Sequence, residues 1–152
     1  MRKNFQKNKY GSEIVGLTRC FYRELATISD FIYYSIILER EYPDLSDFFE
    51  RSAISESECL KDIGASILYL GGDPRIDVAN TSTAIRLRDP SDIEKFEIER
   101  ILCASAENIK KSLSEYDKLM GTICEANTVS VLTRVSLKKR DLLYILEQMI
   151  KS

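Results

Sequence analysis

Two glutamates, Glu24 and Glu56, fall on the apolar stripes of predicted helices, which is where a carboxylate can do chemistry. Glu24 is flanked at helical spacing by apolar residues, namely Leu17, Cys20, Phe21, Ile28 and Phe31. Around Glu56 the same spacing places Ser52, Cys59 and Leu60. A glutamate is rarely buried without a partner, because desolvation penalises its charged form. We therefore expect each to meet a metal ion, a proton or a buried cation; the alternative is a side chain that reaches solvent at the edge of a wider helix face.

Glu107 and Lys139 are two further candidates on the later helices. Glu107 adjoins small residues of its stripe, but it would equally form an ordinary surface pair with Lys111 four residues on. Lys139 lies on or beside an inward face, because its helical neighbours are apolar: Leu132, Val135, Leu143 and Leu146. Its flanking residues Lys138 and Arg140 leave a solvated basic patch as the alternative.

The chain contains no histidine. The usual general base near neutral pH and the commonest metal ligand are therefore missing. This excludes Ser-His-Asp and Cys-His catalysis, zinc sites that need imidazole, and haem held by histidine. No pair of the four cysteines has the C-x-x-C spacing, and we interpret them as reduced thiols of a cytoplasmic protein: Cys20, Cys59, Cys103 and Cys124. For Cys20, Cys59 and Cys103, core packing is the simplest role, although each could add a soft metal ligand.

The composition is that of one soluble globular domain. The chain has 152 residues, of which 44% are hydrophobic and 30% charged, and its net charge is −2. A slightly negative net charge does not indicate a protein that binds nucleic acid or an anionic membrane, since both attract an excess of positive charge. No apolar run reaches the roughly 18 residues that a membrane span needs, and no apolar segment follows the charged start of the chain. We expect neither a nucleic acid nor a membrane as a partner.

The apolar periodicity predicts an all-α fold. Helices are expected at about 12–41, 43–71, 91–125 and 128–150, with a crossover over 72–90. Pro43 can open the second helix, and Gly71-Gly72 can end it. Ser91 and Glu94 have the spacing of a capping box for the third. The helices are joined by a short connection, then the long crossover, then a second short connection. This order indicates a single four-helix bundle domain over 1–152, made of two helical hairpins.

These residues resemble a known family. Glu24, Glu56 and the run Leu70-Gly71-Gly72-Asp73-Pro74-Arg75 are similar to the ferritin-like superfamily, above all its rubrerythrin and bacterioferritin-like branch. The resemblance covers about residues 12–148, and the Leu-Gly-Gly-Asp-Pro-Arg run is typical of bacterial members. The family repeats a Glu on one helix and a Glu-x-x-His on the next in both halves of the bundle. The resemblance implies a ferritin-like fold and a di-iron centre that handles oxygen, peroxide or ferrous iron.

Carried over onto this sequence, the family pattern is incomplete. The resemblance makes Glu24 and Glu107 the terminal carboxylates and Glu56 a bridging carboxylate. Three other ligand positions hold residues of a different kind, since Cys59, Lys139 and Leu142 stand in place of His, Glu and His. The resemblance therefore implies the family's scaffold with a degenerate di-iron site.

We predict that Lys139 replaces the metal, with its ammonium neutralising two or three of the glutamates in a cofactor-free polar core. The function expected from this is non-catalytic: a structural or interaction bundle that forms a dimer or associates with a ferritin-like homologue. The alternative is a divergent oxidoreductase of the ferritin-like type that holds one iron or zinc ion through Glu24, Glu56 and Cys59.

Overall fold

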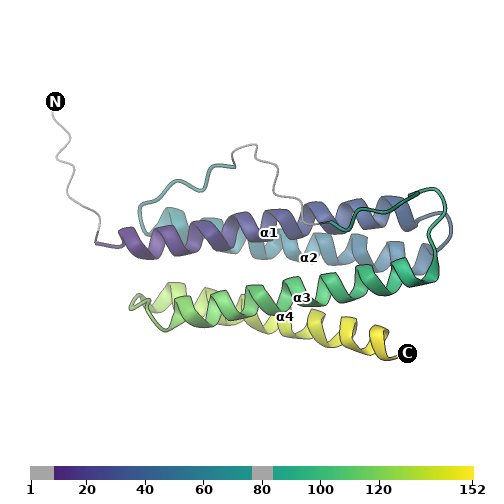
Figure 1. The fold of residues 1–152 in the computed structure, drawn as a ribbon. Coiled ribbons are helices and arrows are strands. Elements are labelled where there is room, and N and C mark those ends of the chain that lie inside the picture. The colour runs from purple at the N-terminus through teal and green to yellow at the C-terminus, as the bar shows by residue number, and fades with distance from the viewer. Residues whose placement is uncertain (1–8, 77–83) are drawn as a thin grey trace.

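The computed structural model describes residues 9–76 and 84–152, and all regular secondary structure in these ranges is helical. The helices are α1 (Gly11–Leu38), α2 (Pro43–Tyr69), α3 (Lys95–Met120) and α4 (Ala126–Lys151). They lie side by side as a bundle, with α1 and α2 forming one antiparallel hairpin and α3 and α4 the other (Figure 1). Between the hairpins, α1 packs against α3 and α2 packs against α4. The all-α four-helix prediction is confirmed.

The connection between the hairpins leaves α2 at one end of the bundle and joins α3 at the other end (Figure 1). At one end, the Tyr22 hydroxyl donates a hydrogen bond of 3.0 Å to the carbonyl oxygen of Arg75. At the other end, the amide of Ile85 donates one of 2.9 Å to the hydroxyl of Tyr34. Both tyrosines belong to α1, so the described parts of the crossover are held on that helix. Part of the predicted crossover, residues 77–83, lies outside the described residues.

The first hairpin differs slightly from its predicted bounds. Helix α1 ends at Leu38 rather than near residue 41, and a final hydrogen bond of 2.8 Å from the Tyr42 amide to the Leu38 carbonyl closes the turn that follows. Helix α2 begins at Pro43, as predicted. It ends at Tyr69, and Gly71 adopts a φ of 95°, which a residue with a Cβ rarely adopts. Gly71 therefore acts as the expected helix stop.

The start of α3 is four residues later than predicted, because a different residue caps it. Ser91 donates from its amide and its hydroxyl to the side chain of Asp89, so it stabilises a turn before the helix. The capping box is instead made by Glu94 and Glu97. At α4, the side chain of Glu125 accepts hydrogen bonds from the first amides of the helix.

The interior is divided into two hydrophobic clusters with a polar layer between them. One cluster contains Phe21, Ile63 and Leu132, and the other contains Phe31, Phe49 and Ile101. Along each helix, the residues between the clusters include buried polar side chains, which are Glu24, Thr27, Glu56, Ser112, Ser136 and Lys139. The middle of the bundle is thus where polar groups must find partners inside the protein.

Within the described ranges, no helix is both long enough and apolar enough to cross a membrane.

Candidate functional site

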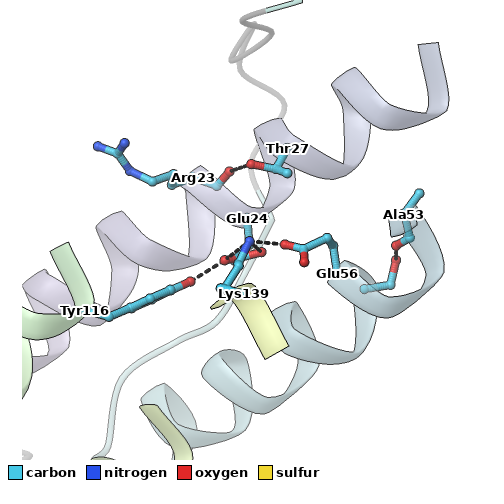
Figure 2. Close-up of polar contacts among 8 residues, drawn as sticks. Arg23, Glu24, Thr27, Ala53, Glu56, Tyr116 and Lys139 are labelled. Carbon is cyan, nitrogen blue, oxygen red and sulfur yellow. Dashed lines mark hydrogen bonds and ion pairs between the residues drawn. The ribbon is translucent and has the colours of Figure 1, made fainter. Parts of the chain in front are cut away.

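A buried lysine lies at the centre of the bundle. The side chain of Lys139 has an exposed fraction of 0%, as does that of Glu24, and Glu56 is almost as fully enclosed. Lys139 Nζ lies 2.7 Å from a carboxylate oxygen of Glu24 and also donates to Oε2 of Glu56 (Figure 2). The ammonium therefore joins α4 to both helices of the first hairpin.

The remaining helix, α3, contributes Tyr116, whose hydroxyl donates a hydrogen bond to Oε1 of Glu24 (Figure 2). One residue from each helix thus meets in this cluster, which we call the Lys139 cluster: Glu24, Glu56, Tyr116 and Lys139. In the sequence, Tyr116 falls at helical spacing among apolar residues of α3, and this spacing gives it no polar role. A signal was available, because the hydroxyl of a buried tyrosine usually needs a hydrogen-bond partner.

The charges of the cluster change the ionisation of its members. Burial by itself lowers the pKa of Lys139, but the negative charges and hydrogen bonds of Glu24 and Glu56 outweigh burial and raise that pKa above its ordinary value. Burial, and then the charge of Glu24, raise the pKa of Glu56 well above its ordinary value despite the nearby ammonium. Burial and Glu24 likewise raise the pKa of Tyr116. One ammonium facing two carboxylates leaves one negative charge, and a proton on Glu56 brings the cluster to neutrality.

The raised pKa of Glu56 predicts a pH-dependent stability. Above the ordinary pKa of 4.5, the unfolded chain loses the Glu56 proton while the folded protein keeps it. Stability must then fall as pH rises, by about 1.4 kcal/mol per pH unit until the folded pKa is reached. Glu24, Tyr116 and Lys139 face Glu56 from the other helices, and Lys139 is charged in both states throughout this window.

We expect the free energy of unfolding of the native protein, relative to Glu56→Gln, to decrease between about pH 5 and the folded pKa of Glu56. Urea titrations at a series of pH values measure it. The control is Glu58→Gln on the same helix, because the Glu58 side chain is 65% exposed. A difference between native and Glu56→Gln that stays flat with pH would show that Glu56 is ionised in the fold.

Cys59 is fully buried beside the cluster. Burial, and then the charges of Glu56 and Glu24, raise its pKa to about 12. Burial and the charge of Glu115 raise the pKa of Cys20 to about 12 in the same way. Both side chains are therefore protonated thiols at neutral pH, whereas metal ligation needs the thiolate. Cys103 is exposed on α3.

Glu107 does not join the cluster, although the family resemblance makes it a terminal carboxylate of this site. It is exposed, because the inward stripe of α3 passes through Ser105, Ala106 and Ile109 and leaves the intervening position on the outer side. Leu142 is half-buried and packs against the hydrophobic cluster that contains Phe31.

The side chains of the site do not fit a two-metal carboxylate centre. In residues 9–76 and 84–152, no three or more Cys, Asp or Glu side chains are arranged so that they could hold a metal ion. The ammonium of Lys139 lies against the two carboxylates that would serve as ligands, and a protonated lysine has no lone pair to offer a metal. What the arrangement can do chemically is balance buried charge and tie four helices together.

Comparison with known proteins rests on structure, since no family model and no curated protein matches the sequence. The bacterioferritin of Desulfovibrio desulfuricans, solved with its diiron site in different catalytic states, superposes with a TM-score of 0.77 at 16% identity, over 93% of this chain and 79% of that chain. The Rhodobacter capsulatus bacterioferritin, solved with a metal-free dinuclear site and haem iron, gives 0.74 at 18% identity, over 93% of this chain and 84% of that chain.

A third similar structure is the ferritin-like, diiron-carboxylate protein of Bacillus anthracis. Its TM-score is 0.70 at 15% identity, over 92% of this chain and 96% of that chain. Identities this low establish a common fold and leave the chemistry of the site to the residues themselves. Helix order, the long crossover and these superpositions agree, and the chain has the ferritin-like four-helix-bundle fold.

Proposed function

We propose that this protein is a metal-independent ferritin-like bundle that has lost the di-iron centre and serves as a structural or interaction subunit. One observation carries the proposal: the Lys139 ammonium bonds directly to Glu24 and Glu56, the carboxylates that would otherwise need a metal. The lysine supplies the positive charge from within the chain, so the helices are held together without an added ion.

The donor set supports the loss of redox chemistry. A centre of two metal ions needs several anionic or imidazole ligands around them. This chain has no imidazole, and Lys139 and Leu142 occupy two of the positions that the family pattern gives to ligands. The one-metal alternative built on Glu24, Glu56 and Cys59 would have to displace the Lys139 ammonium, which bonds to both carboxylates.

An interaction role is supported by apolar side chains on the outer surface. On α1, Ile32 and Ile36 lie one turn apart with exposed fractions of 47% and 65%, and on α2 Ile54 is 61% exposed. Burial of such side chains against a protein partner removes apolar surface from water, which favours association. We infer that the partner is a second copy of this chain or a ferritin-like homologue, and that the protein acts in the cytoplasm.

The proposal is tested on protein purified from cells grown with added iron and manganese. After dialysis, we expect elemental analysis to find less than one metal ion per chain, and we expect no acceleration of ferrous oxidation or peroxide turnover over buffer. In the same preparation, sedimentation equilibrium should show a dimer or a larger assembly.

Metal retained in stoichiometric amounts would overturn the proposal. Cys59→Ala then identifies the site, because loss of that metal in the variant assigns it to the position built on Glu24, Glu56 and Cys59, whereas a core thiol affects only stability. A protein that sediments as a monomer at all concentrations and binds no ferritin-like homologue would contradict the interaction role.

A further inference from the structure

A second feature of the molecule lies on its surface, in the groove between α1 and α3. The groove is an open surface hollow with a volume of about 490 Å³. Its lining includes Arg19, Tyr22 and Arg23 from α1 and Asn108 and Lys111 from α3. We refer to it as the α1–α3 groove. It is separate from the Lys139 cluster, because the Arg23 side chain points away from Glu24 and Lys139 (Figure 2).

The α1–α3 groove is positively charged although the chain as a whole has a net charge of −2. Three cationic side chains line it and no carboxylate does. Among the residues that the structure describes, Arg19, Arg23 and Lys111 take part in no ion pair. Arg23 as a whole is half-buried.

The groove on the other side of the bundle provides a contrast. Between α2 and α4, a hollow of about 530 Å³ is lined by Arg51 and Lys138 but also by Glu58 and Asp141. There Lys138 lies 3.2 Å from Glu58, and Arg51 lies 3.1 Å from a carboxylate of its own helix. That groove is charge-balanced, whereas the cations that line the α1–α3 groove have no ion-pair partner among the residues that the structure describes.

Some carboxylates lie near the α1–α3 groove without lining it; one is Asp30, which is buried and borders a neighbouring hollow together with Asn108. Glu115 lies in another neighbouring hollow, which Arg19 also borders and which contains a further cation, Lys118. Glu107, one turn before Lys111, is exposed and does not lie within ion-pair distance of it. An anion entering the groove therefore meets an excess of positive charge.

We propose that the α1–α3 groove binds a small phosphate monoester. Arg19 and Arg23 are one helical turn apart, and their guanidinium groups can each donate paired hydrogen bonds to a tetrahedral oxyanion. Lys111 adds a point charge from the facing helix, and Asn108 adds an amide. The volume exceeds that of a bare phosphate ion, and the organic part of the ligand lies along Tyr22 and Ala26. This site does not depend on the proposed function of the Lys139 cluster.

The test is isothermal titration calorimetry of the full chain with inorganic phosphate and with phenyl phosphate, at about 150 mM sodium chloride, where the Debye length is only about 8 Å. We expect saturable binding with one site per chain, tighter for phenyl phosphate than for phosphate. Arg23→Gln and Lys111→Gln should each weaken binding about tenfold, because each removes one charge-assisted contact. Arg51→Gln in the α2–α4 groove is the matched control and should bind as the native protein does.

Circular dichroism and urea titration establish that each variant is folded. Phosphate binding that is equally strong in Arg23→Gln and Arg51→Gln would overturn the proposal, as would binding that disappears at this salt concentration. Binding to a polyanion such as single-stranded DNA, with no binding of phenyl phosphate, would also overturn it and assign the groove to nucleic acid.

Discussion

Replacing Lys139 by methionine should lower the free energy of unfolding by about 3–5 kcal/mol, because removing one partner of a buried ion pair leaves the other charge without compensation. In this protein the variant leaves Glu24 and Glu56 facing each other in the interior. Methionine has a similar length and fills most of the space, so the loss reports on charge rather than on a cavity. Urea unfolding followed by circular dichroism measures it.

Lys138→Met is the control, since it changes the neighbouring residue on the same helix. Lys138 is paired with Glu58 at 3.2 Å, but its side chain is 38% exposed. A surface pair of this kind contributes about 0–1 kcal/mol. Equal losses in the two variants would contradict the assignment of Lys139 as the central cation. Adding Glu24→Gln and Glu56→Gln to the Lys139→Met variant should recover much of its stability, because the unpaired charges are then gone.

Replacing Lys139 by glutamate should make the fold depend on a divalent cation. The variant places a third carboxylate beside Glu24 and Glu56, and three clustered carboxylates repel one another unless protons or a cation neutralise them. We expect Mn²⁺ to bind the variant and to raise its free energy of unfolding by about 2.7 kcal/mol at a metal concentration a hundred times the dissociation constant. The native protein should show no such increase.

Lys139→Gln is the matched control, because it removes the same charge without adding an acidic ligand. Calorimetric titration with Mn²⁺ and urea unfolding with and without chelator compare the three proteins. If the glutamate variant is unfolded without metal, refolding it in the presence of Mn²⁺ gives the same information. Tight Mn²⁺ binding by the native protein would show that a metal can displace the lysine, and it would contradict the proposed function.

The Lys139→Met experiment measures the energetic cost of unpaired buried charge. The Lys139→Glu experiment measures whether the site can bind a metal ion. A buried ion pair is weak evidence for stability by itself, because desolvation offsets much of the attraction. In this bundle the Lys139 ammonium compensates the charge of the two buried carboxylates. Its removal is therefore costly while Glu24 and Glu56 remain, and much less so after they are neutralised.

Much of the fold follows from local patterns in the sequence. Apolar spacing of three and four residues identified the helices, and Pro43 and Gly71 marked two of their boundaries, because capping and backbone preferences act over a few residues. The start of α3 was misplaced by four residues, because Ser91 and Glu94 have the capping-box pattern. In the folded chain Glu94 and Glu97 form the box, and Ser91 bonds to Asp89. Whether a glutamate or a lysine lies on an apolar stripe is also a local property, and this identified Glu24, Glu56 and Lys139 as candidates.

Only the tertiary structure decided which of these side chains meet. The stripe of a helix gives a direction, but contact between helices depends on their rotation and axial register, which packing of all four helices sets together. Tyr116 and Glu107 are nine residues apart and so lie on opposite faces of α3; packing turns the Tyr116 face toward Glu24 and leaves Glu107 in solvent. Distances between helices also decide the charge balance of the cluster and which described residues line the α1–α3 groove. The periodicity along a single helix contains no information on these distances.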